Sequence, residues 1–268
     1  MSSHPSGGAA AGAVPILAYH TIADDSRPEI APFAVRPAAF ARHLDLIVGG
    51  GHTALTVSDY VAFVLLGVAL PPRPVVITFD DGFEDNLSVA APLLAERGLP
   101  ATVFVSTGLL PGCPGGPSGR TFGPMIPWAR LRELEAADVE IGAHSRTHPQ
   151  LDVLRRSEAS LEIARSKADL EAALGHPVSS FAYPHGYASA WLQDEVRRLG
   201  FLSACGVRHA FSYPGDNRWL LARLVVGATT TDARLDGWLH LSGARPAPRR
   251  EHVRTKAWRG VRRARVSL

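Results

Sequence analysis

Residues 75–82 read Val-Val-Ile-Thr-Phe-Asp-Asp-Gly, an apolar run rich in β-branched side chains that ends in two carboxylates. Such a run is typical of a buried parallel strand. In α/β proteins, functional side chains gather at the carboxyl ends of parallel strands. We therefore expect Asp80 and Asp81 to lie at the functional edge of a sheet.

A second cluster closes another strand-like run about sixty residues later. Residues 139–148 read Val-Glu-Ile-Gly-Ala-His-Ser-Arg-Thr-His. Taken alone, an Asp-Asp-Gly is more often a turn or a helix cap, and a His-x-x-x-His pair is often a solvated helix face. Their joint occurrence after two apolar strands favours a metal site formed by one of the two aspartates with His144 and His148. One carboxylate and two imidazoles leave open positions on a divalent ion, as catalytic sites do.

The rest of the chain alternates between strand and helix patterns. Further strands are expected at residues 14–20, 101–105, 178–182 and 201–205, and helices at 37–48, 85–97 and 157–174, the last capped by Ser157. The Gly- and Pro-rich residues 108–127 predict a long loop near the site. Repeated strand-helix units predict an α/β fold with a parallel sheet, but periodicity does not choose between an open sheet and a barrel.

Length and composition favour one catalytic domain. A chain of 268 residues with 46% hydrophobic content can bury one large core. We expect a flexible N-terminal tail at residues 1–13, a catalytic domain at 14–243 and a basic tail at 244–268. The chain starts without a basic region followed by an apolar core, and no stretch reaches about eighteen uninterrupted apolar residues. These features predict a cytoplasmic protein with free thiols.

Basic side chains are concentrated at the C-terminal end. Residues 245–268 hold nine Lys and Arg side chains against Glu251, a charge of +8, so the remainder carries −5 within the net +3. This asymmetry predicts either a solubilising end or contact with an anionic lipid or a diphosphate, and hence a peripheral position at the inner membrane face. Nucleic acid is disfavoured because no stacking motif accompanies the charge.

Thr78-Phe79-Asp80-Asp81-Gly82 and His144-Ser145-Arg146-Thr147-His148 match the paired motifs T-F-D-D-G and H-[ST]-x-x-H. From about residue 14 to 227 the chain resembles the polysaccharide deacetylases that share the NodB-homology domain, carbohydrate esterase family 4. The resemblance implies a distorted, incomplete (β/α) barrel of about seven parallel strands. It also implies that Asp80 is the general base and that Asp81, His144 and His148 hold a divalent metal, with zinc favoured over nickel or cobalt.

A third motif departs from the family pattern. Residues 181–186, Phe-Ala-Tyr-Pro-His-Gly, stand where the family has R-x-P-[YF], so Ala182 occupies the position of an arginine that pairs with the catalytic aspartate. We expect Arg223 to replace that arginine, although it could be an ordinary strand residue. His185 replaces an aromatic residue whose backbone amide helps to hold the oxyanion, and a backbone donor survives that change.

Two histidines are candidates for the general acid. His20 ends the first strand in a Tyr-His pair and is favoured, although it could be a rim histidine bonded to a nearby loop. His240 lies in a late Leu-His pair that reads better as part of an amphipathic helix.

The predicted activity is metal-assisted hydrolysis of an N-acyl group, in particular N-acetyl, on an amino sugar. The substrate could be a glycoside, a nucleotide sugar, an antibiotic precursor or a lipid-linked saccharide. Alternatives are an O-acetyl esterase acting on carbohydrate and a metal-containing carbohydrate-binding protein without catalysis. Ser145 and Thr147 are expected to orient the metal ligands. Removing residues 245–268 is expected to leave turnover of a small soluble substrate nearly unchanged.

Overall fold

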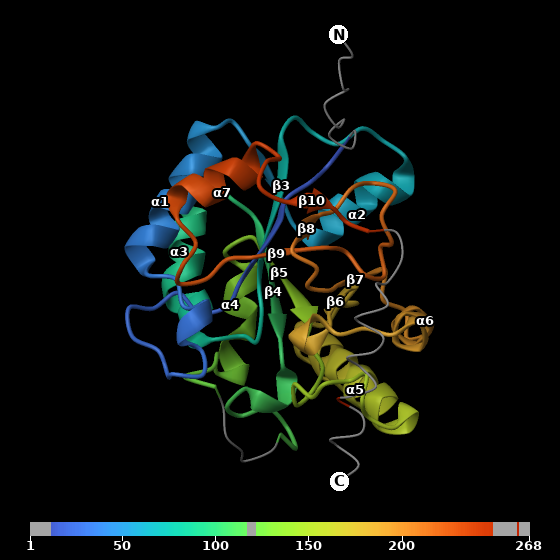
Figure 1. Cartoon of the computed structure of the whole chain (residues 1–268). Coiled ribbons are helices and arrows are strands. Elements are labelled where there is room, and N and C mark those ends of the chain that lie inside the picture. The colour runs from blue at the N-terminus through green and yellow to red at the C-terminus, as the bar shows by residue number, and fades with distance from the viewer. Residues whose placement is uncertain (1–11, 117–121, 249–261, 263–268) are drawn as a thin grey trace.

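The computed structural model describes residues 12–116, 122–248 and 262 (Figure 1). Seven parallel strands form the central sheet in the order β7-β6-β5-β4-β3-β1-β9. They are β1 Ile16–Tyr19, β3 Pro74–Phe79, β4 Ala101–Val105, β5 Val139–Ala143, β6 Ser180–Ala182, β7 Ser203–Cys205 and β9 Leu224–Val225. An eighth strand, β2 (Thr53–Leu55), pairs with the start of β3. The expected barrel of about seven parallel strands is confirmed.

The two edges of the sheet approach each other without a full ladder. Cys205 of β7 forms an isolated parallel bridge with Leu221, just before β9. The Leu221 amide donates to the Ala204 carbonyl at 2.8 Å, and the Gly206 amide donates to the Leu221 carbonyl at 2.9 Å. Because the edges meet through an isolated bridge and not through a continuous ladder, the barrel is distorted and incomplete.

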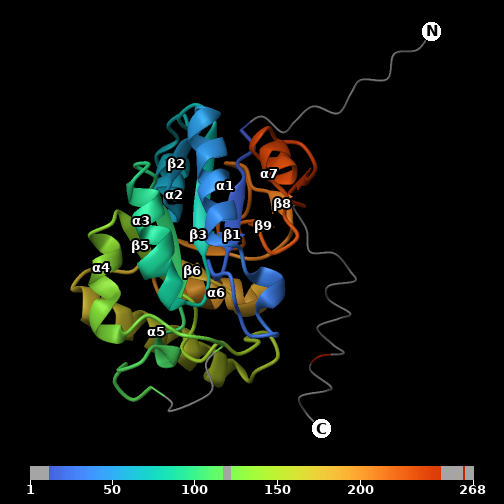
Figure 2. The same cartoon turned by 90° about the vertical axis from the view of Figure 1, so that its left-hand side faces the viewer.

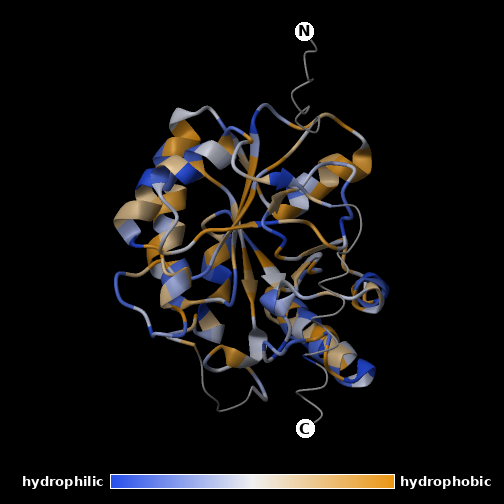
Figure 3. Cartoon of the chain, in the orientation of Figure 1, coloured by the Kyte–Doolittle hydropathy of each residue, from blue (hydrophilic) through white to orange (hydrophobic). Residues whose placement is uncertain are grey.

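Helices surround the strands, as Figures 1 and 2 show from two sides. They are α1 Pro37–Gly49, α2 Val57–Leu66, α3 Ala91–Ala95, α4 Leu131–Glu135, α5 Arg156–Leu174, α6 Ala190–Arg198 and α7 Asp232–Leu239. The strands are largely hydrophobic and the helices mix hydrophobic with hydrophilic residues (Figure 3). This pattern is expected when each helix buries one stripe against the sheet. Among the described residues, no helix is long and apolar enough to cross a membrane.

Some sequence expectations need correction at the level of single elements. The helix expected at residues 85–97 begins with a π-helical turn, η2 (Asn86–Ala90), before α3. Ser157 does not cap α5, because the helix already begins at Arg156 and the Glu158 carboxylate accepts from the Arg155 amide at 3.2 Å. The strand β2 and helices α2 and α6 were not predicted, although Thr56 and Asp59 form a capping box at the start of α2.

The barrel interior is filled by apolar side chains of several strands. Ile16, Val76, Phe104 and Cys205 belong to one buried cluster. Gly142 makes room for the Phe104 ring, since a Cβ atom at this position would lie only 2.4 Å from the ring. The Phe104 ring therefore fills the barrel interior below the carboxyl ends of the strands.

The C-terminal part of the chain continues along the domain beyond residue 243. Two further strands, β8 (Ala210–Phe211) and β10 (Arg245–Pro246), pair with each other, and Ala247 is buried. The expected N-terminal tail lies outside the described residues up to residue 11. Of the basic tail, residues 244–248 and Arg262 are described.

Candidate active site

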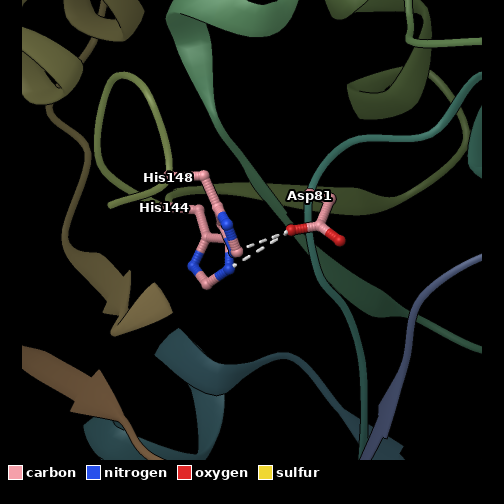
Figure 4. Close-up of side chains that lie close together, drawn as sticks. All are labelled: Asp81, His144 and His148. Atoms are coloured by element: carbon pink, nitrogen blue, oxygen red, sulfur yellow. Dashed lines mark ion pairs between the residues drawn. The ribbon is translucent and has the colours of Figure 1, made fainter. Parts of the chain in front are cut away.

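Three side chains from the ends of β3 and β5 converge on one point (Figure 4). Asp81 follows β3, whereas His144 and His148 follow β5. The Asp81 Oδ1 atom lies 3.5 Å from the His144 Nε2 and 3.1 Å from the His148 Nε2. The ligand atoms of the three residues lie within 4.8 Å of one another. A single divalent cation could contact all three.

The donor set fits a cation rather than a hydrogen-bond network. The Nδ1 of His144 lies 2.8 Å from the Ala182 carbonyl, to which it can only donate, so its Nε2 presents a lone pair to Asp81. The Asp81 Oδ1 atom is buried and makes no regular hydrogen bond within residues 12–116, 122–248 and 262. Buried oxygen and nitrogen lone pairs facing one another need a positive charge between them, which a metal ion would supply.

The backbone is strained where these side chains project. Asp81, Ser145 and His148 have φ angles of 76°, 62° and 59°, in the left-handed region that non-glycine residues rarely adopt. Such residues each cost about 1–3 kcal/mol and persist only where the surroundings impose them. The strain indicates that the fold holds these side chains in place.

A carboxylate on α5 holds the loop that carries both histidines. Glu162 accepts from the backbone amides of Arg146 at 3.0 Å and Thr147 at 2.7 Å, and from the Thr147 hydroxyl at 2.9 Å. The Ser145 hydroxyl accepts from the His148 amide at 3.1 Å. Ser145 and Thr147 thus shape the loop, whereas the part played by Glu162 had no signal in the sequence.

Asp80 lies beside the triad and pairs with Arg223. The two guanidinium nitrogens Nη1 and Nη2 each lie 2.7 Å from one oxygen of the Asp80 carboxylate, and both side chains are buried. Arg223 also donates to the Gly206 carbonyl at 3.0 Å and lies over the Phe104 ring at 5.6 Å. Its positive charge therefore stands beside Asp80 although Ala182 occupies the family's arginine position.

The electrostatics of the site keep its carboxylates charged and His144 neutral. Burial alone would raise the pKa of Asp80, but the charge and hydrogen bonds of Arg223 hold this pKa below its ordinary value. Burial also opposes ionisation of Asp81, but the neighbouring His148 holds the pKa of this carboxyl below its ordinary value. Burial lowers the pKa of His144 to about 4. A metal ion binds ionised carboxylates and neutral imidazoles, so Asp81 and His144 have the protonation states that metal ligands need.

The remaining predicted residues lie at different distances from the triad. The His185 ring is 4.6 Å from the His148 ring. His20 follows β1, packs against Phe33 with the ring centroids 4.7 Å apart, and lies close enough for its charge to lower the pKa of Asp80 and Asp81. His240 is exposed at the end of α7 and pairs with Asp236.

The position of His240 argues against a role in the site. Its ring lies 6.1 Å from that of His52, which precedes β2 at the amino end of the strands. The triad lies at the opposite, carboxyl end. Of the two general-acid candidates, the structure brings only His20 to the triad.

One residue of the basic tail reaches the loop that follows β6. Arg262 stacks on the Tyr187 ring at 3.6 Å and pairs with Asp152 through contacts of 2.8 and 2.6 Å. The Tyr187 ring in turn stacks against that of His185 at 6.3 Å. This contact links the tail to the rim of the site.

Comparison with known proteins agrees with this geometry. The family profile described as polysaccharide deacetylase matches residues 67–204. The chain belongs to the polysaccharide deacetylase family. A putative polysaccharide deacetylase of Bacillus subtilis, YxkH, is 25% identical over 190 residues, which are 70% of this chain and 62% of that relative. The chain therefore spans less than two thirds of the relative's length.

Solved structures share the fold of this deacetylase domain. The Streptococcus pyogenes deacetylase PplD, in complex with acetate, superposes with a TM-score of 0.74 at 23% identity, covering 83% of this chain and 96% of that one. IcaB from Ammonifex degensii gives a TM-score of 0.70 at 24% identity, covering 85% and 97%. At these identities the likeness concerns the fold.

Proposed function

We propose that this chain is a metal-dependent carbohydrate de-N-acetylase that hydrolyses the N-acetyl group of an amino sugar. The observation that carries the proposal is the position of Asp80. This buried carboxylate is kept ionised by Arg223 and lies directly beside three side chains suited to a divalent ion. Metal-assisted hydrolysis of an amide needs a general base next to a metal site with an open position.

Asp81, His144 and His148 would hold the ion, and zinc fits one carboxylate and two imidazoles. When bound, the metal supplies Lewis-acid polarisation of the acyl oxygen and lowers the pKa of water. Asp80 would take the proton of the attacking water. The backbone amide of His185 would donate to the oxyanion. His20 would give a proton to the amine nitrogen as the C–N bond breaks, leaving acetate and a free amino sugar.

Arg223 weakens the case for a binding protein without catalysis. The main support for that alternative is the missing arginine at Ala182. Because Arg223, the residue before β9, brings a guanidinium to both oxygens of Asp80, the charge is present after all. An O-acetyl esterase would use the same residues but would depend less on His20, since an alcohol leaves more readily than an amine.

The nature of the sugar rests on sequence arguments. A cytoplasmic glycoside, nucleotide sugar, antibiotic precursor or lipid-linked saccharide remains our proposal for the substrate class. The proposed contact of the tail with an anionic lipid or diphosphate falls mainly outside the described residues.

The direct test is acetate release from matched N-acetylated and O-acetylated sugars by the zinc-loaded protein, with Asp80→Asn as control. We expect release from an N-acetylated sugar and a loss of about 10²- to 10⁴-fold in the variant. Release from O-acetylated sugars alone would establish the esterase instead. Zinc and sugar binding without any acetate would establish the binding protein.

A further inference from the structure

The turn that carries His20 is fastened to the segment that follows the two aspartates. The Asp85 carboxylate accepts from the Ile22 amide at 2.9 Å and from the Thr21 hydroxyl. The Asn86 side-chain amide donates to the His20 carbonyl at 2.7 Å and to the Asp85 Oδ1 at 3.1 Å. Three of these four bonds join positions more than sixty residues apart in sequence.

Thr21, Asp85 and Asn86 form a unit that we call the β1 clamp. Thr21 and Asn86 are buried, at 3% and 1% exposure, so water does not compete freely for their hydrogen bonds. Asp85 immediately precedes the π-helical turn η2, whose first residue is Asn86. π-Helices are rare, usually consist of a single turn, and are frequently found at functional sites. At the start of this turn, the side chains of Asp85 and Asn86 both bond to the residues that follow β1.

The clamp bonds to the backbone of His20 and not to its ring. Within the described part of the chain, the His20 Nδ1 is buried without a hydrogen-bond partner, and the ring is supported by Phe33 at 4.7 Å. With no side-chain bond to orient it, the imidazole depends on the position of its own main chain.

We propose that Asp85 and Asn86 are positioning residues that place the His20 imidazole for proton transfer to the leaving amine. The inference rests on the proposed function, in which His20 protonates that nitrogen. A displacement of about 1 Å in a reacting group can cost about 10²-fold in rate. A main-chain anchor on His20 is therefore expected to matter for the step in which the amine departs.

The leaving group separates this role from a structural one. An amide nitrogen must be protonated before it leaves, whereas the phenolate of an aryl ester leaves without a proton. Misplacing His20 should therefore slow amide hydrolysis and spare hydrolysis of an aryl acetate. A general loss of folding would slow both reactions equally.

The test compares kcat/KM for an N-acetylated sugar with that for an aryl acetate, using zinc-loaded wild type and three variants. Asn86→Leu removes the donor to His20 at similar volume, and His20→Ala removes the acid itself. Leu87→Ala is the matched control, because Leu87 is buried in the same π-helical turn but makes no bond to His20. Near-ultraviolet circular dichroism establishes that each variant is folded at the assay temperature.

We expect the amide-to-ester ratio to fall by about 10- to 100-fold in Asn86→Leu, to fall further in His20→Ala, and to stay within about threefold of wild type in Leu87→Ala. An unchanged ratio in Asn86→Leu, with a reduced ratio in His20→Ala, would overturn the positioning role while leaving the proposed function intact. An unchanged ratio in His20→Ala would overturn both the acid assignment and the clamp. Absence of amide hydrolysis in wild type would overturn the proposed function and this inference with it.

Discussion

Two carboxylates in the same barrel, Asp80 and Glu140, accept hydrogen bonds from different kinds of donor. Asp80 follows β3 at the carboxyl end and pairs with the charged Arg223. Glu140 lies on β5, near the amino end, and is surrounded by neutral donors. It accepts from the Ser58 amide at 3.1 Å and from the hydroxyls of Ser58, Thr102 and Ser180 at 2.6, 2.8 and 2.6 Å.

The difference shows that hydrogen bonding alone does not mark a functional carboxylate. Glu140 joins the start of α2 to three strands, so its bonds hold the barrel together. Asp80 pairs with a charged donor, Arg223, and lies beside the metal triad, an arrangement that keeps a base ionised. We therefore expect changes at Asp80 and Arg223 to affect activity first, and changes at Glu140 to affect stability first.

The largest effect is expected from Arg223→Met, which leaves Asp80 buried without its charge partner. We expect kcat/KM to fall at least about 10²-fold at neutral pH, because the pKa of Asp80 rises and less of the base is ionised. Arg223→Lys should restore part of the activity. A pH–rate profile checks the cause, since the acidic limb should move to higher pH; wild-type activity in Arg223→Met would contradict the pairing.

Replacing the second carboxylate should reverse the pattern. Glu140→Ala leaves three hydroxyls and one amide without their acceptor, and we expect the free energy of unfolding to fall by about 2–4 kcal/mol. Below the unfolding transition, kcat/KM should stay within about threefold of wild type. Urea unfolding and acetate release on one sample measure both quantities. A loss of activity without a loss of stability would show that Glu140 belongs to the site.

A fall in pH should reduce the free energy of unfolding through the protonation of His144. Burial holds the pKa of this histidine at about 4, against about 6.5 in an unfolded chain, so the unfolded state binds the proton first as the pH falls. Metal-free wild type should therefore lose about 3 kcal/mol between pH 6.5 and 4 through this group. Asp80 and Asp81, with lowered pKa values, keep their contributions until the pH falls below about 4.

The matched measurement is urea unfolding of metal-free wild type and His144→Asn across this range. The slope of stability against pH should be shallower in the variant, by up to one proton. Equal slopes would show that His144 is not held neutral in the folded protein.

The smallest effect is expected at the tail. Arg262→Ala removes the partner of Asp152 and the cation that stacks on Tyr187, and we expect Tm to fall by a few degrees with kcat changed less than about threefold. Arg259→Ala, which removes the same charge outside the described residues, is the control. Truncation after Pro248 keeps β10 and should behave like Arg262→Ala. A large loss of kcat would show that the tail helps to build the site.

The sequence predicted those parts of the site that stand next to strongly apolar strands. Asp80, Asp81, His144 and His148 each follow a run that could be read locally, and the motifs they form implied the fold. Two apolar runs, which become β3 and β5 on either side of β4, therefore carry these four residues, and both runs can be recognised without any knowledge of long-range contacts.

The remaining features depend on contacts between distant segments. Glu162, Asp85 and Asn86 act through backbone groups of other loops, and the fit of Phe104 against Gly142 depends on strand register. Register and loop packing leave no periodic signal in a single sequence. Arg223 could be named as a candidate from the family resemblance, because Ala182 leaves the usual arginine position empty and one branch of the family often has an arginine before a late strand.

The central claim is that Asp81, His144 and His148 share one divalent ion with Asp80 beside it. Anomalous diffraction at the zinc edge from crystals of the zinc-loaded protein tests this claim most directly. We expect one peak about 2.0–2.2 Å from an Asp81 oxygen and from the Nε2 atoms of both histidines, with Asp80 outside the ligand set. No peak at this point, or a peak with Asp80 as a ligand in place of Asp81, would contradict the account.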